Sequence, residues 1–314
     1  MTYNKNKINK KNYIIVSIIG GLGNQILQYI FAKSLANKLG CLLILDTSFS
    51  KLKIPSEKYK KKNPNKFLLK LFRLQNISIK NNIFKLNIKY LPYLRFLNFP
   101  VIKEIVPLFF RKRINNFYYD YTFTKDNIHI KLLYNQYKKN SYFYGYWQKI
   151  LYSNLLDTKV LKELSLKKKL LHNSFEKKKI NKKDIAIHIR GGDYLFKKNR
   201  SYNIADAKFY EKAINFYYKK ILNPKFHIFT DDQNHARKIL FKFKNDKNFL
   251  FIKKNKNEID DFEALRNYYN YIIPNSTFSY VASFLSKNGK TCIILPKKWR
   301  LLQKTSLPKT ILAF

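Results

Sequence analysis

One short segment, His188 to Tyr194 (HIRGGDY), combines residue types that bind phosphate groups. His188 and Arg190 alternate where a buried strand is predicted to end, and two glycines then let the backbone turn close to a ligand. A planar guanidinium can donate to two phosphate oxygens at once. The segment is therefore predicted to bind a phosphate-bearing ligand. The alternative is structural, with His188 in the core and Arg190 in a salt bridge to Asp193.

Two more loops place polar side chains where strands are predicted to end. Asp231 and Asp232 are adjacent acids in a chain with few acids, and one of them is suited to accept hydrogen bonds from a base or a ribose. The alternative role for Asp232 is a helix N-cap. The segment from Asn275 to Ser279 (NSTFS) offers hydroxyl and backbone N–H groups at a helix start, which suits phosphate. Capping alone would need only one of its residues.

A glycine-rich segment, Gly20 to Gln25 (GGLGNQ), follows a predicted strand and opens a predicted helix, and Asp46 ends the next strand. This order is typical of dinucleotide-binding turns, in which an acid binds the ribose. Ile26 stands where that motif has its third glycine, so a simple tight turn explains the segment equally well. Asn24 and Gln25 nevertheless add polar groups that a simple turn does not need.

The sequence disfavours a metal-dependent reaction. It contains no Asp-x-Asp motif, and its histidines and cysteines have no ligand spacing. Positive charge at a phosphate site would then come from Arg190 and from helix N-termini. Cys41 and Cys292 lie inside apolar runs, which favours a reducing compartment.

The elements that must position these loops form two α/β patterns. Near the N-terminus, a β-branched run (14–18), a glycine turn, a helix with one apolar face (24–39) and a second buried strand (42–45) predict a β-loop-α-β unit. From residue 184 onward strands and helices alternate, which predicts a second, doubly wound α/β domain. Its expected strands are 185–189, 226–229, 249–252, 271–273 and 292–295, and its expected helices are 207–221, one from 234, 260–268 and one after 275.

The predicted boundaries are residues 1–150 for an N-terminal Rossmann-like domain, 151–180 for a helical connection and 181–314 for a C-terminal Rossmann-like domain. Between Lys51 and Asn140 aromatic and basic residues mix without a clear period, so mostly helices and loops are expected there. Ligands bind at the carboxyl ends of strands in open parallel sheets. The polar loops are therefore expected at those edges.

The charge of the chain is extreme, with 63 Lys and Arg against 19 Asp and Glu and a formal net charge of +44. Such a field attracts nucleic acid, an anionic membrane face or a phosphate-bearing substrate. The basic residues are spread along the chain and form no recognisable nucleic-acid module. One hypothesis that accommodates the charge is a cytoplasmic protein held peripherally at the inner, anionic face of a membrane.

Taken together, the motifs GGLGNQ, GYWQ, HIRGGDY, FTDD, NSTFSYVASFL and PKKW resemble the α-1,2-fucosyltransferases of glycosyltransferase family 11, in order and in spacing, from Ile14 to Trp299. The resemblance implies a GT-B fold, two Rossmann-like domains facing across a cleft. It also implies GDP-fucose as donor, no metal or other cofactor, and inverting transfer of L-fucose to the 2-hydroxyl of a galactoside in surface glycan or O-antigen synthesis.

The resemblance also implies roles for single residues. Arg190, Asp193 and Asn24 are the expected catalytic residues, with Asp193 either the general base or a partner that holds Arg190. The other expected contacts are to the donor (His188, Arg190, Asp231, Asp232, Asn275, Ser276, Thr277, Ser279) and to the acceptor (Gly21, Gly23, Asn24, Gln25).

One position departs from the family pattern, because Gly191 stands where a second arginine is usual. Arg190 would then act alone on the diphosphate, or with a lysine such as Lys197, and donor binding is expected to be weaker or differently oriented. Two alternatives remain: a GT-B transferase that uses another nucleotide sugar, and a basic protein that binds nucleic acid or another polyanion. The expected partners are GDP-fucose and a galactose-containing glycan, for which a lipid-linked form is one option. Specific binding of a nucleic acid is not expected.

Overall fold

The computed structural model describes ten segments of the chain and divides it into two compact units, Met1–Lys168 (unit 1) and Lys169–Phe314 (unit 2). The described residues are 12–51, 66–81, 116–119, 137–152, 155–167, 180–195, 205–253, 257–289, 291–299 and 311–314. Each unit contains its own parallel sheet. The predicted class, with two α/β domains, is confirmed.

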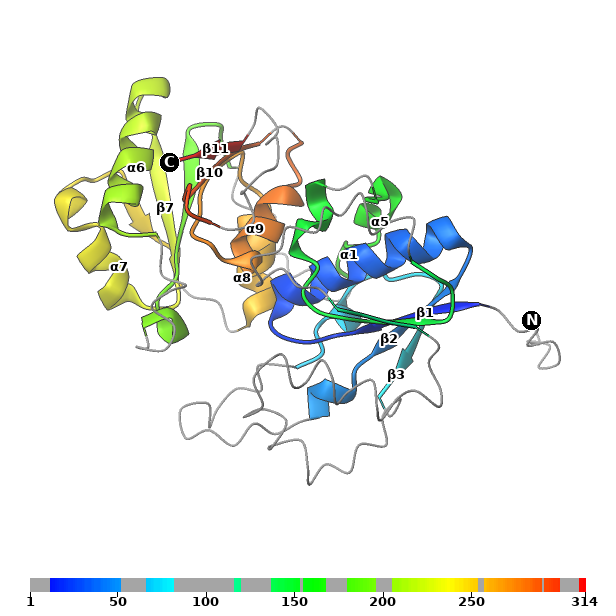
Figure 1. The fold of residues 1–314 in the computed structure, drawn as a ribbon. Coiled ribbons are helices and arrows are strands. Elements are labelled where there is room, and N and C mark those ends of the chain that lie inside the picture. The colour runs from blue at the N-terminus through cyan, green and yellow to red at the C-terminus, as the bar shows by residue number, and fades with distance from the viewer. Residues whose placement is uncertain are drawn as a thin grey trace. The chain divides into compact units, whose positions relative to one another are not determined.

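Unit 1 is built on a five-stranded parallel sheet with the order β3-β2-β1-β5-β4. Its strands are β1 (Tyr13–Ser17), β2 (Leu42–Asp46), β3 (Ile77–Lys80), β4 (Asn116–Tyr119) and β5 (Ser141–Tyr144). Helix α1 (Leu22–Leu39) links β1 to β2 and is buried along most of its length (Figure 1). It ends at Gly40, whose φ of 62° suits glycine at a helix C-terminus.

Mostly helices and loops were expected between Lys51 and Asn140, but the described part of that region contains two strands and no α-helix. Two strands, β3 and β4, form the opposite edges of the unit 1 sheet, and a single 3-10 turn, η3 (Leu69–Leu71), precedes β3. Each strand is four residues long, too short for its period to be visible in the sequence. Residues 52–65, 82–115 and 120–136 lie outside the described residues.

The N-terminal part of the expected helical connection packs within unit 1. It contains the 3-10 turn η5 (Gln148–Tyr152) and the short helix α5 (Thr158–Lys162), and another 3-10 turn, η1 (Ser48–Lys51), follows β2. Asn37 of α1 donates to Asp157, the N-cap of α5, at 2.8 Å. The rest of the expected connection, residues 168–179, is outside the described residues.

Unit 2 is built on a six-stranded parallel sheet with the order β11-β10-β9-β6-β7-β8. The strands are β6 (Asp184–Ile189), β7 (Lys225–Thr230), β8 (Phe249–Phe251), β9 (Asn270–Ile272), β10 (Cys292–Leu295) and β11 (Ile311–Ala313). The helices are α6 (Ala207–Lys220), α7 (Gln233–Ile239), α8 (Glu258–Leu265) and α9 (Thr277–Phe284). Two 3-10 turns, η7 (Gly192–Leu195) and η9 (Phe241–Phe243), complete the unit. The predicted alternation is confirmed within a few residues at each end.

The two faces of the unit 2 sheet carry different helices, as Figure 1 shows. Ile185 and Ile187 of β6 pack in one core cluster with the buried side of α6 and with α7. His188, which points to the other face, contacts α9, and α9 packs beside α8. Because successive residues of a strand alternate between faces, the six buried residues of β6 serve both layers.

Each unit contains one of the two cysteines of the chain, Cys41 in unit 1 and Cys292 in unit 2. Both are half-buried free thiols. Burial raises the pKa of each thiol above its usual value. In the described part of the chain, no helix is both long and apolar enough to cross a membrane.

Candidate donor-binding site

Arg190 is the first residue after β6 and lies at the carboxyl edge of the unit 2 sheet. Its Nη1 atom is 2.6 Å from Oδ2 of Asp231, which follows the neighbouring strand β7. The arginine side chain is 34% exposed and the aspartate side chain 22% exposed, so the pair remains in contact with solvent. A partly exposed guanidinium that a carboxylate orients is suited to donate hydrogen bonds to phosphate oxygens.

The two acids of the FTDD loop have different roles in the structure. Asp231 accepts a hydrogen bond from the backbone N–H of Gly191 through Oδ1 at 2.8 Å and pairs with Arg190 through Oδ2. Asp232 is the N-cap of α7 and accepts from the N–H of His235 at 3.0 Å. The alternative considered for Asp232, a helix cap, is therefore what the structure shows, whereas Asp231 holds the HIRGGDY loop.

The glycines of the HIRGGDY loop let it pack directly on the acidic loop. A Cβ atom on Gly191 would lie 2.6 Å from Cβ of Asp232, and one on Gly192 would lie 2.8 Å from Oδ2 of Asp231. Gly192 also has a φ of 48°, which glycine adopts without strain. A larger residue at position 191 would require the loops to separate, which gives the departure from the family pattern a physical reason.

His188 is buried and links β6 to α9. Its Nδ1 atom is 2.8 Å from Oγ of Ser279, and its carbonyl oxygen accepts from the hydroxyl of Tyr210 at 2.8 Å. Burial, and to a smaller extent the charge of Arg190, lower the pKa of His188 to about 4. Ser279 is also fully buried. Both side chains were expected to contact the donor, but in the structure they join the strand to the helix behind the loop.

The NSTFS loop lies at the same edge, at the N-terminus of α9. Among the described residues, the N-cap residue Ser276 makes no side-chain capping bond to the first N–H groups of α9. Asn275 and Thr277 are half-buried on either side of it. The end of α9 therefore offers backbone donors and the positive end of a helix dipole to an anion.

Tyr194 connects the HIRGGDY loop to the NSTFS loop, a role that sequence reasoning missed. Its hydroxyl donates to the carbonyl oxygen of Asn275 at 3.1 Å, and its ring centroid lies 5.7 Å from Cζ of Arg190. The second distance is within the range of a cation–π contact. The only signal in the sequence was an aromatic residue at the end of the motif.

The side chain of Asp193 lies outside the described residues, although its backbone is part of η7, and Lys197 is outside them altogether.

Three loops of the unit 2 sheet meet around Arg190. Asp231 contacts it from one side, and Tyr194, bonded to Asn275, contacts it from the other. The described segments contain no group of three or more His, Cys, Asp or Glu side chains that could hold a metal ion.

In unit 1, the GGLGNQ segment forms a turn at the carboxyl end of β1. Gly20 has a φ of 77°, and Gly21 is the N-cap of α1. Gly23 and Asn24 lie in the first turn of the helix, where Oδ1 of Asn24 accepts from Nε2 of Gln148 at 3.3 Å. Asn24 is half-buried.

Gln25 differs from the expectation that it faces an acceptor, because it is fully buried. Its Nε2 atom donates to the carbonyl oxygens of Gly20 and Lys66, both at 2.8 Å, and its Oε1 atom accepts from the N–H of Leu68 at 3.0 Å. One turn later, Gln28 accepts a hydrogen bond from the N–H of Ile19 and donates one to the carbonyl oxygen of Gly145. These two amides hold the glycine turn in place, and nothing in the sequence pattern distinguished them from surface groups.

Comparison with known proteins identifies a family and a relative of this chain. The model of the family "Glycosyl transferase family 11" matches residues 13–306. An α-1,2-colitosyltransferase of Escherichia coli is 25% identical over 294 residues, which cover 91% of this chain and 92% of that protein.

Solved structures with a similar fold include two fucosyltransferases. The α-1,6-fucosyltransferase NodZ, soaked with GDP-fucose, has a TM-score of 0.46 at 13% identity and covers 88% of this chain and 92% of its own. A mutant of Arabidopsis thaliana FUT1 in complex with GDP has a TM-score of 0.46 at 11% identity. The match covers 91% of this chain and 70% of that chain. Because the family model spans nearly the whole sequence, the chain belongs to glycosyltransferase family 11.

Proposed function

We propose that the protein transfers L-fucose from GDP-fucose to the 2-hydroxyl of a galactoside, with inversion at the anomeric carbon and without a metal ion. The observation that carries the proposal is the arrangement around Arg190, whose guanidinium is held by Asp231 and Tyr194 beside the N-terminus of α9. Family membership supports glycosyl transfer, and the α-1,2 linkage in the name of the colitosyltransferase supports the linkage.

In the proposed reaction, the acceptor hydroxyl attacks the anomeric carbon of the donor and the bond from that carbon to the diphosphate breaks. GDP leaves with additional negative charge, and the proton of the acceptor hydroxyl passes to a base, for which Asp193 remains the proposed residue. Arg190 and the N–H groups at the start of α9 would stabilise the leaving diphosphate. Since Asp231 already orients Arg190, little reorganisation is needed when the donor binds.

The acceptor side of the proposal rests on unit 1. Asn24, with Gly21 and Gly23 beside it, lies in the first turn of α1 and remains the proposed contact to the acceptor and the reacting centre. We propose a galactose-containing glycan, lipid-linked where the product is a surface polysaccharide. Gln25 would support this contact only by holding the turn.

A second candidate donor is a GDP-linked colitose, favoured by the colitosyltransferase relative. Colitose is L-fucose without its 3-hydroxyl group, so the two donors share the nucleotide and the diphosphate. In this proposal, the three loops around Arg190 bind only these shared parts of the two donors. A competition assay with both donors, in which each product is identified by mass, separates the two candidates.

The central experiment measures transfer from GDP-fucose to a galactoside in the presence of a chelator. The wild-type protein should be active, and GDP should raise its melting temperature whereas UDP and NAD should not. Replacing Arg190 with Ala should lower kcat/KM by about 100-fold or more. Arg237→Ala, a matched change on the exposed surface of α7, should have little effect. Full activity of the Arg190 variant, or activity only with a divalent cation, would contradict the proposal.

A further inference from the structure

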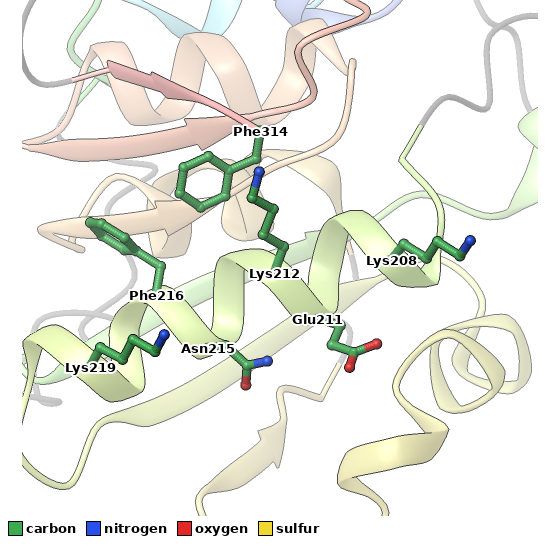
Figure 2. A pocket seen from close by; sticks show the side chains of 7 residues that line it. All are labelled: Lys208, Glu211, Lys212, Asn215, Phe216, Lys219 and Phe314. Carbon is green, nitrogen blue, oxygen red and sulfur yellow. The ribbon is translucent and has the colours of Figure 1, made fainter.

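A groove of about 470 Å³ runs along the outer side of α6 in unit 2 (Figure 2). Its lysines lie on the exposed side of α6, and one wall is formed by Phe216 and Phe314, which pack against the core of unit 2. Its lining consists of basic, polar and aromatic side chains: Lys208, Glu211, Lys212, Asn215, Phe216, Lys219 and Phe314.

The lysines of this groove form a row because of their spacing. Lys208, Lys212, Asn215 and Lys219 are four, three and four positions apart, which places them on one face of a helix. All four are exposed, while the opposite face of α6 is buried against the sheet. α6 is therefore an amphipathic helix whose outer face is basic.

The groove retains its positive charge because its single acid is already paired. Glu211 accepts from Nζ of Lys242, in η9, through both carboxylate oxygens, at 2.7 and 2.8 Å. The lysine row therefore faces solvent with an uncompensated field. An anionic partner is the complement of this surface.

Apolar groups lie among these charges. The rings of Phe216 and Phe314 are in edge contact with centroids 5.6 Å apart, and Nζ of Lys212 lies 5.0 Å from the centroid of Phe314. Just beyond α6, Leu222 is 77% exposed, more than any other large apolar side chain in the described segments. Lysines beside aromatic and leucine side chains are the composition of surfaces that lie at the membrane interface.

We propose that this surface, which we call the α6 basic face (Lys208, Lys212, Lys219, Phe216 and Phe314), docks the protein on a membrane containing anionic phospholipids. The lysines lie in a row along the exposed side of a helix, as a contact with a plane of headgroups requires. Phe314 packs against Phe216, and Lys212 lies over its ring, which leaves less ring surface for base stacking, the main contact of single-stranded nucleic acid.

Docking through this face would leave the candidate donor site uncovered within unit 2. α6 packs on one side of the sheet, whereas His188 meets α9 on the other, and Arg190 lies at the carboxyl edge. The docking proposal therefore does not depend on which sugar nucleotide the site takes. It locates the membrane contact on a surface separate from the chemistry.

The test measures co-sedimentation of the full chain with phosphatidylcholine vesicles that contain or lack phosphatidylglycerol. Binding should require the anionic lipid. Each lysine near a membrane contributes about fivefold to binding, so the variant Lys208→Gln, Lys212→Gln, Lys219→Gln should bind about 100-fold more weakly. Its melting temperature should not fall and its transfer to a soluble acceptor should be unchanged, since all three side chains are exposed.

A matched control removes three exposed lysines of unit 2 that do not line the groove, by Lys182→Gln, Lys183→Gln and Lys253→Gln. This variant has the same net charge and should lose less than about threefold in vesicle binding. Equal losses in the two variants would overturn the proposal, as would wild-type protein that does not prefer anionic vesicles. Tighter binding of an RNA oligonucleotide that depends on the same three lysines would assign the face to nucleic acid and also overturn it.

Discussion

Asp231 and Asp232 are neighbours in the chain but hold different partners. Replacing Asp231 with Asn keeps an acceptor for the N–H of Gly191 and removes the charge that orients Arg190. Because the pair is partly exposed, we expect a loss of roughly 1 kcal/mol, seen as about a five- to tenfold higher KM for the donor.

Asp232→Asn is the matched control for this prediction. Asparagine is as good an N-cap as aspartate, so α7 should keep its cap and KM should change by less than about twofold. Steady-state kinetics with varied donor distinguish the two variants. An equal effect of both would show that Asp231 has no special role in orienting Arg190.

His188 makes the stability of unit 2 depend on pH. Its pKa is about 4 in the folded protein against an ordinary value of 6.5, because it is buried and because Arg190 is close. The unfolded chain therefore takes up a proton first as pH falls. The stability due to the neutral histidine is fully present above about pH 6.5 and is lost as pH falls toward 4.

His188→Asn removes this titration while keeping a polar group for Ser279. Between about pH 7 and pH 4, the free energy of unfolding of the wild type should fall by about 1 to 3 kcal/mol more than that of the variant. Urea unfolding at several pH values measures the difference. Parallel curves for the two proteins would mean that His188 keeps an ordinary pKa in the folded state.

At the scale of elements, the first turn of α1 depends on the buried amide of Gln25. Gln25→Ala leaves the N–H of Leu68 and the carbonyl oxygens of Gly20 and Lys66 without their partner. Unsatisfied buried groups are costly, so unit 1 should lose about 2 to 4 kcal/mol of stability.

Asn24→Ala, one residue earlier, removes only a 3.3 Å hydrogen bond at a half-buried position and should cost less than about 1 kcal/mol. If Asn24 contacts the acceptor, this variant should instead lose activity while its melting temperature stays the same. Urea unfolding and transfer assays on both variants give the comparison. A stable but inactive Gln25→Ala protein would mean that Gln25 acts at the reacting centre and not by stabilising unit 1.

The elements differ in how visible they are in the sequence. Strands such as β6 are continuous apolar runs buried on both faces, so they could be predicted from composition. β3 is half exposed and is defined mainly by its pairing with β2, from Leu43 opposite Ile77 to Asp46 opposite Lys80. Such an edge strand has no local pattern strong enough to predict.

The same distinction applies to the candidate site. The HIRGGDY, FTDD and NSTFS loops could be assigned to one edge of a sheet because each follows a predicted parallel strand. The partners of their side chains depend on which strands are neighbours. Arg190 pairs with Asp231, 41 positions away, because β6 lies beside β7. Gln25 is buried because the segment around Lys66 and Leu68 covers it, which no local pattern indicates.

At the scale of the whole molecule, the net charge of +44 opposes folding through self-repulsion. The described ion pairs, such as Arg266 with Glu263 at 2.6 Å, involve few of these charges and cannot offset a charge spread along the chain. Raising sodium chloride from about 20 to 300 mM should therefore raise the melting temperature, because screening weakens repulsion between exposed charges. Potassium chloride should act equally. A melting temperature that falls with both salts would show that attractive pairs dominate.

Because each unit contains one half-buried free thiol, the labelling of the two cysteines can report on the opening of each unit separately. Since burial and a raised pKa slow the alkylation of a thiol, each cysteine should react faster when its own unit opens. Mass spectrometry after timed labelling can count the two openings separately. Under the proposed function, GDP should slow the labelling of Cys292 and leave that of Cys41 unchanged if the units open independently. Equal protection of both thiols would mean that the two halves of the enzyme open as one cooperative body.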